Sequence, residues 1–136
     1  MNVRATAENL DREIVDALKD WTNTDLRRAV NEAIEESAAT AAKELRKGGP
    51  YQDRTGNYSK DWGHKLRARK YSSVINTEEY TVYNKKHYQL THLLEKGHQS
   101  RNGKRKVPAF EHIAPVAELV EQLVISNIGK KVREIT

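Results

Sequence analysis

The side chains best suited to catalysis or metal binding in this sequence are its five histidines. His87 and His92 are five residues apart, which places them on different faces of a helix, whereas a helical metal-binding pair is four residues apart. No ligand motif links the other candidates for a shared metal ion, which are His92, His98 and His112 with Glu95 or Glu111. We therefore predict that the protein has no metal site.

Adjacent carboxylates are the other candidates, as a general acid–base pair. Glu35-Glu36 falls in an expected helix and Glu78-Glu79 in an expected turn, where neighbours in sequence point apart. The sequence contains no nucleotide-binding, serine-hydrolase or zinc-protease motif, and without cysteine it has no thiolate chemistry. We predict that the protein is not an enzyme and has neither catalytic residues nor a cofactor.

Positive charge is concentrated in the middle of the chain. Residues 48–110 carry 13 Lys/Arg against 5 Asp/Glu, whereas residues 1–47 carry 8 against 10 and residues 111–136 carry 3 against 4. This distribution favours a negatively charged partner, although a solvated cationic surface is an alternative interpretation. The candidate residues form two groups: a strand face of Lys65, Arg67 and Arg69, and a loop containing His98, Arg101, Lys104, Arg105 and Lys106.

These cations also suit sequence-independent contact with nucleic acid. Lys and Arg would neutralise phosphates, and tyrosines such as Tyr58, Tyr71 or Tyr83 would stack on bases. The sequence has no helix-turn-helix signature, RNP box or zinc finger. A small basic nucleic-acid-binding domain is therefore the alternative function.

Helical periodicity dominates residues 1–47. A first helical segment is expected over residues 6–21, capped by Thr6. A second is expected to begin at Thr24 or Asp25 and to end at Gly48-Gly49-Pro50. Its predicted buried stripe is Leu26, Val30, Ile34, Ala38, Ala41 and Leu45.

Residues 55–96 are expected to form a sheet followed by a short helix. Alternation from Trp62 predicts a half-buried strand whose inner side carries Trp62, His64, Leu66 and Ala68. Further strands are expected at residues 74–75 and 80–83, joined by a turn at residues 76–79. Trp62 and Leu66 are expected to pack on Ile34, Leu119 and Leu123.

A short helix and a basic loop are expected next. Leu90, Leu93 and Leu94 lie on one helical face, which we expect to pack on the sheet before Gly97 ends the helix. Residues 97–110 are predicted to be an exposed loop. The C-terminal helix, within residues 111–136, is expected to start near Pro115 and to loosen at Gly129. Its apolar residues are Val116, Leu119, Val120, Leu123, Val124 and Ile128.

The predicted architecture is α+β, as one domain over residues 1–136. A small antiparallel sheet of three to four strands packs against N-terminal and C-terminal helices, with the short helix and exposed basic loop between them. The longest apolar run falls far short of the ~20 residues that span a bilayer, and no secretory signal is visible, so we expect no membrane association.

Three segments of the chain carry a family resemblance: RTGNYSKDW, VYNKKHYQLTHLLEKGH and VPAFEHIAP. Together they resemble the neck and tail-component family of long-tailed double-stranded-DNA bacteriophages, the gene-product-ten type of head–tail joining or minor tail proteins. The family's Thr-Gly turn before the first strand matches Thr55-Gly56, and its Glu-x-Gly segment matches Glu95-Lys96-Gly97. Its proline-led entry to the last helix matches residues 108–115, from Pro108 to Pro115. The resemblance covers residues 55–115, and the region 70–79 is longer than a minimal hairpin.

This resemblance implies a non-enzymatic virion protein of the neck or tail, assembled in the cytoplasm of the bacterial host. Its expected partners are further copies of itself in a ring, the head-closure and tail-terminator or tail-tube proteins, and passing DNA without sequence specificity. Within a ring, the loop cations would meet carboxylates of a neighbour, such as Glu32, Glu35 or Glu36, or the next ring of the neck.

Overall fold

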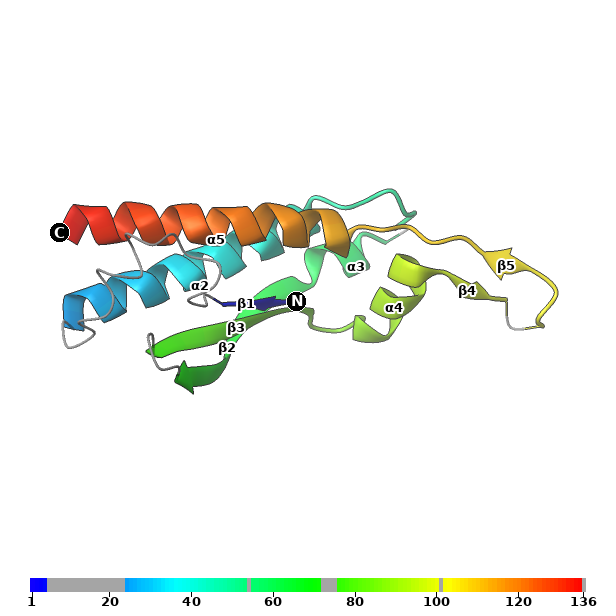
Figure 1. Cartoon of the computed structure of the whole chain (residues 1–136). Coiled ribbons are helices and arrows are strands. Elements are labelled where there is room, and N and C mark those ends of the chain that lie inside the picture. The colour runs from blue at the N-terminus through cyan, green and yellow to red at the C-terminus, as the bar shows by residue number, and fades with distance from the viewer. Residues whose placement is uncertain (5–23, 54, 72–75, 101, 136) are drawn as a thin grey trace.

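The computed structural model describes residues 1–4, 24–53, 55–71, 76–100 and 102–135 of the chain. Its fold is α+β, as predicted: two long helices lie beside an antiparallel three-stranded sheet, and a short helix and a two-stranded hairpin lie at one end (Figure 1). The helical segment expected at residues 6–21, the strand expected at residues 74–75, and Arg101 lie outside the described residues.

Helix α2 (Thr24–Arg46) is the centre of the core. The six residues of its predicted stripe, Leu26, Val30, Ile34, Ala38, Ala41 and Leu45, are all buried, which confirms the prediction. The stripe is rich in alanine, and such small side chains let a neighbouring backbone approach closely. The chain leaves the helix through Gly48 at φ +93°, a left-handed conformation that glycine adopts without steric cost.

Helix α5 (Ile113–Ile135) packs along α2 through residues four apart, Val120, Val124, Ile128 and Val132. Two sequence predictions are wrong here. Leu119 is 50% exposed because it lies outside this stripe. Gly129 does not loosen the helix, since it is buried within it and the helix continues to Ile135. The helix also begins two residues before Pro115, which sits in its first turn.

The larger sheet has the order β1-β3-β2 and is antiparallel throughout. It comprises β1 (Asn2–Val3), β2 (Trp62–Tyr71) and β3 (Asn76–Asn84), and α2 packs on all three strands. The predicted turn at residues 76–79 is wrong: these residues belong to β3, where Tyr71 pairs with Asn76. Strand β1 was not anticipated, because two residues carry no periodicity.

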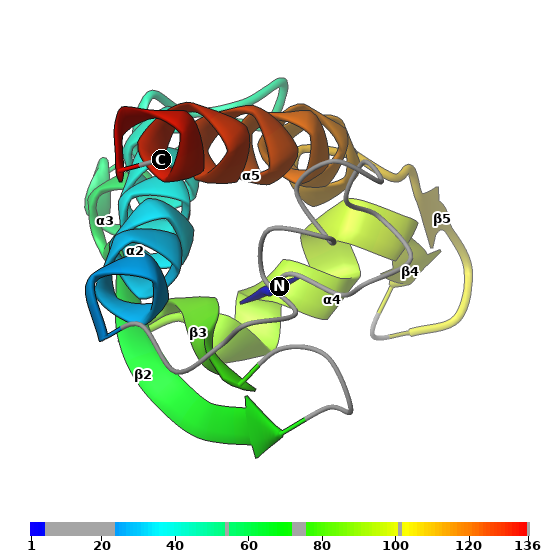
Figure 2. The same cartoon turned by 60° about the vertical axis from the view of Figure 1, so that its left-hand side comes forward.

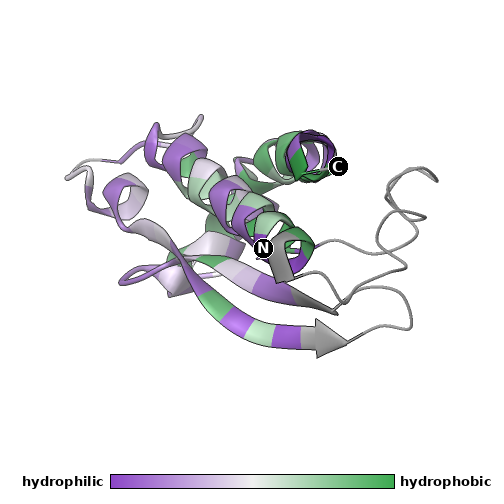
Figure 3. Ribbon diagram, turned by 90° about the vertical axis from the view of Figure 1, so that its left-hand side faces the viewer, coloured by the Kyte–Doolittle hydropathy of each residue, from purple (hydrophilic) through white to green (hydrophobic). Residues whose placement is uncertain are grey.

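The inner side predicted for strand β2 holds for Trp62, which is buried, and His64, which is half-buried, but not for Leu66, which is exposed. The pairs Trp62–Asn84, His64–Val82 and Leu66–Tyr80 are followed by a register shift between Leu66 and Ala68. Figure 3 shows polar and apolar residues alternating along β2, and Figure 2 shows the strand curving strongly. A bulge bends and twists a strand. Leu66, immediately before the shift, is 41% exposed and does not form the expected sheet–helix junction.

The remaining elements lie at the end of the sheet where β2 begins. They are α3 (Asn57–Lys60), α4 (Tyr88–Lys96), β4 (His98–Gln99) and β5 (Lys106–Val107). Strands β4 and β5 pair as a hairpin, so the segment predicted as a loop over residues 97–110 contains a two-stranded sheet. Figure 1 shows this hairpin extending away from the body of the molecule. We call α4 together with β4 and β5 the projecting lobe.

Candidate assembly surface

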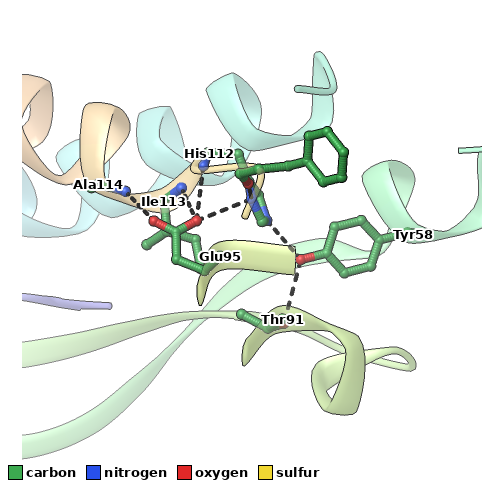
Figure 4. A network of polar contacts seen from close by, with 7 residues as sticks. Tyr58, Thr91, Glu95, His112, Ile113 and Ala114 are labelled. Atoms are coloured by element: carbon green, nitrogen blue, oxygen red, sulfur yellow. Dashed lines mark hydrogen bonds and ion pairs between the residues drawn. The ribbon is translucent and has the colours of Figure 1, made fainter. Parts of the chain in front are cut away.

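A buried set of polar contacts attaches the projecting lobe to the body (Figure 4). Tyr58 from α3 and His112, which directly precedes α5, meet with 2.8 Å between the phenol oxygen and Nε2. His112 Nδ1 lies 2.9 Å from the Phe110 carbonyl oxygen and 3.1 Å from Glu95 Oε1. Because both neighbours of Nδ1 are acceptors, Nδ1 carries the proton and Nε2 accepts the Tyr58 hydroxyl. We call Tyr58, Glu95 and His112 the clasp.

Glu95 of α4 caps the N-terminus of α5 from outside that helix. Its Oε1 accepts the backbone N–H groups of His112 at 2.8 Å and Ile113 at 3.0 Å, and its Oε2 accepts that of Ala114 at 3.0 Å. A helix leaves its first N–H groups without internal partners, and its dipole favours a negative charge there. Burial raises the pKa of Glu95, but these three hydrogen bonds and nearby His112 outweigh it and lower the pKa below its ordinary value.

The clasp has the acid–histidine–hydroxyl order of a catalytic triad, but its environment opposes catalysis. Tyr58 and His112 are both buried. Burial, followed by the Glu95 and Asp53 charges, raises the pKa of Tyr58 even though a hydrogen bond with Thr91 lowers it. A phenol with a raised pKa keeps its proton and is a poor nucleophile. The clasp is therefore suited to holding three elements together.

Aromatic rings surround the clasp. Tyr51, Tyr58 and Trp62 pack edge-on around the His112 ring, with centroid distances from 4.9 to 6.2 Å. Gly49 is required beside them, because a Cβ at that position would lie 3.0 Å from the His112 Cβ and closer still to Tyr51. Burial and the neighbouring Tyr58 and Asp53 raise the pKa of Tyr51 to about 12.

Acid should weaken the clasp. The folded-state pKa of Glu95 is lower than the ordinary value of 4.5, so the unfolded chain binds the proton more tightly and the native state is favoured above that pH. We expect the melting temperature to be level near neutral pH and to fall as the pH drops through the lowered pKa. Circular dichroism melts across this range, for the wild type and Glu95→Gln, measure the effect. Parallel pH profiles for the two proteins would contradict this role of Glu95.

Glu95 and Gly97 each have a structural role, and the two roles account for the Glu-x-Gly motif. The Gly97 N–H donates to the Leu93 carbonyl at 3.0 Å and closes α4. Its backbone has φ +75° and ψ 171°, a conformation essentially restricted to glycine. A Cβ there would lie 2.7 Å from the Val107 carbonyl oxygen and 3.2 Å from the Pro108 carbonyl carbon. The motif thus joins two functions: one residue caps α5 and the other turns the chain into the hairpin.

The hairpin presents cations at its tip. Ser100 N–H donates to the Arg105 carbonyl at 2.6 Å, and the turn is closed by Gly103, whose φ is +72°. The side chains of Lys104, Arg105 and Lys106 are exposed, whereas His98 is half-buried. The structure therefore brings the described cations of the predicted loop together on one exposed turn.

The leucines of α4 do not pack as expected. Leu94 contacts the core, but Leu90 is 43% and Leu93 40% exposed. Helix α4 attaches through the side that carries Thr91 and Glu95, and Leu90 and Leu93 lie on the opposite side. The prediction that all three leucines lock α4 to the sheet is wrong for two of them.

The predicted cationic strand face is largely neutralised by β3. Arg67 Nη1 lies 3.0 Å from Glu79 Oε1, and Arg69 Nε lies 3.7 Å from Glu78 Oε1. Lys65 instead places Nζ 4.7 Å from the centre of the Tyr83 ring. This strand is a weaker candidate for a phosphate-binding face than the hairpin, because two of its cations already have carboxylate partners.

The Thr55-Gly56 turn leads first into the short helix α3, and the chain enters strand β2 only after that helix. Thr55 Oγ1 accepts the Asn57 N–H at 3.2 Å, and Gly56 has φ +74°. The Asp53 carboxylate accepts the Ser59 N–H at 2.8 Å, and this hydrogen bond lowers the pKa of Asp53. The sequence did not reveal α3, which places Tyr58 in the clasp.

Comparisons of the chain with protein-family models, curated proteins and solved structures found no match. Within the described residues, no three His, Asp or Glu side chains gather in a way that could hold a metal ion. No helix in the described part of the chain is long and apolar enough to cross a membrane.

Proposed function

We propose that the protein is a non-enzymatic structural component of the head–tail connection of a long-tailed bacteriophage or prophage. It would form a ring of identical copies in the neck or tail of the virion, beside the head-closure and tail-terminator or tail-tube proteins. The observation that carries the proposal is the projecting lobe. It combines two exposed leucines, an exposed cationic turn and hydrogen-bonded attachment to the body by the clasp.

The lobe is suited to contact with another protein for an energetic reason. Leu90 and Leu93, on one side of α4, keep apolar area in contact with water in the isolated chain. Exposed apolar residues that lie together beside charged groups are typical of interaction sites. In a closed ring each interface joins two different patches, so every copy would bury its lobe against a neighbour. An attachment that holds the lobe in place before docking would lower the entropy lost on docking.

Removal of the hairpin charges tests this proposal. Replacing Arg101, Lys104, Arg105 and Lys106 with serine should leave the melting temperature nearly unchanged, because the described members of this set are exposed. In phage production the same variant should yield heads and tails that are not joined. Electron microscopy of the particles measures this outcome. Serine at Lys43, Lys60 and Lys130, which are exposed elsewhere, is the matched control and should join normally.

The same serine variant distinguishes the proposed assembly function from the alternative function, nucleic-acid binding. The exposed hairpin cations also favour sequence-independent nucleic-acid binding, whose affinity falls steeply as salt rises. If the serine variant joins particles normally but loses DNA affinity in a salt series, the nucleic-acid function is correct. If it unfolds, the hairpin is structural, and the assembly role of its charges is wrong.

A further inference from the structure

The projecting lobe has a uniform charge around its apolar residues. From residue 85 to residue 107 the chain carries seven Lys/Arg and one carboxylate, Glu95. That carboxylate is engaged in capping α5. Leu90 and Leu93 are exposed within this cationic segment, as are Lys96 and the described cations of the hairpin tip. A partner for this face should present apolar side chains among carboxylates.

The outer side of α5 has this composition. Residues 107–129 carry three carboxylates, Glu111, Glu118 and Glu121, and no Lys or Arg. All three are exposed, and Leu119 is 50% exposed. Because Leu119 and Glu121 are two residues apart, they lie on opposite flanks of this outer side, with Glu118 between them. Glu118 and Glu121 are three residues apart and so lie on neighbouring positions of the helix surface. Both this face and the lobe are exposed in the same chain, so the chain does not cover one with the other.

We propose that the cationic lobe of one copy docks on the outer side of α5 of a second copy, with Leu90 and Leu93 against Leu119 and the hairpin cations against Glu118 and Glu121. This inference rests on the proposed ring and identifies the two surfaces that form its repeated contact. The contact is heterologous, because the two faces differ, and it can repeat from copy to copy.

The carboxylates of α2 are less suitable partners for the cations of the lobe than the sequence suggested. Glu32 and Glu36 lie 3.7 and 3.1 Å from Lys131 of α5, in ion pairs within the chain. Burial, followed by Glu78 and Glu35, raises the pKa of Tyr80, which places Glu35 near a buried phenol. These groups serve contacts within the subunit, whereas Glu118 and Glu121 belong to no such described ion pair.

Charge reversal and rescue test the docking. Lys104→Glu with Arg105→Glu places negative charge on the lobe, and Glu118→Lys with Glu121→Lys places positive charge on α5. Sedimentation velocity of the purified full chain, at low salt and over a concentration series, measures self-association. We expect each double variant to weaken it by at least about tenfold, since two opposed charge pairs become repulsive. The four-fold variant, with both faces reversed, should recover association. Lys43→Glu with Lys130→Glu is the control and should behave as the wild type.

Three outcomes overturn the inference: a wild-type chain that remains monomeric, double variants that associate as the wild type does, or a four-fold variant that fails to recover. Circular dichroism melts verify that each variant is folded, and Leu119→Ser provides an independent variant that leaves every charge in place. It should also weaken association. If the wild type joins heads to tails while remaining monomeric, the docking is wrong and the proposed function survives. If association follows the charges but particles join without the protein, the proposed function is wrong and the docking survives.

Discussion

We expect Trp62→Ala to lower the free energy of unfolding by about 3–5 kcal/mol, the typical cost of removing a large buried aromatic side chain. Trp62 is 4% exposed at the start of β2. Its ring lies 6.0 Å from Tyr58 and 6.2 Å from His112, between centroids. Its truncation therefore leaves a cavity beside the clasp and disturbs the attachment of the lobe. The expected packing of Trp62 on Leu119 is wrong, because Leu119 faces solvent.

Trp62→Phe is the matched control. Trp62 Nε1 makes no hydrogen bond to another described residue, so phenylalanine removes volume without removing a described hydrogen bond. We expect a loss of about 1–2 kcal/mol, within the range for a change of shape in a packed core. Urea denaturation of the three proteins measures the difference. Near-wild-type stability of Trp62→Ala would show that this residue does not fill the core.

The second large effect is expected at Glu95. Glu95→Ala removes the carboxylate that accepts three backbone N–H groups at the start of α5 and leaves the buried His112 without its acidic neighbour. Loss of hydrogen bonds to a charged group at a helix terminus should cost about 2–4 kcal/mol. Urea denaturation measures this cost.

Two control variants make the Glu95 prediction specific. Glu95→Gln keeps one acceptor oxygen and should retain part of the stability, whereas Glu111→Ala removes an exposed carboxylate and should change stability by less than about 0.5 kcal/mol. Equal effects of Glu95→Ala and Glu111→Ala would mean that capping of α5 contributes nothing measurable. In that case the lobe would need another attachment.

The core of the helices was predictable because one periodicity covers a long segment. The stripe of α2, from Leu26 to Leu45, is buried as predicted, and Gly48 follows the end of the helix. Alternation from Trp62 likewise predicted a strand. The bulge after Leu66 could not be predicted, since it depends on how β2 pairs with β3. The turn expected at residues 76–79 failed because polar residues also occur within a central strand: Glu78 and Glu79 lie in β3 and face arginines of β2.

The candidate site was predictable in its residue types but not in its geometry. The three-leucine pattern of α4 indicates an apolar side, but the polar contacts of Thr91 and Glu95 decide which side faces the body. Glu95 and Gly97 were identified through the family resemblance. Their roles in capping and turning depend on His112, Val107 and Pro108, which contact them only in the folded chain. Tyr58 gave no signal of its own, because its partner is 54 residues away.

Electron microscopy of particles made without the protein tests the proposed role in head–tail joining most directly. The coding sequence would be interrupted in the phage or prophage that carries it, and the particles would be counted before and after addition of the purified wild-type chain. We expect filled heads and separate tails without the protein, and joined particles once it is added. Joined, infectious particles in its absence would contradict the proposed function.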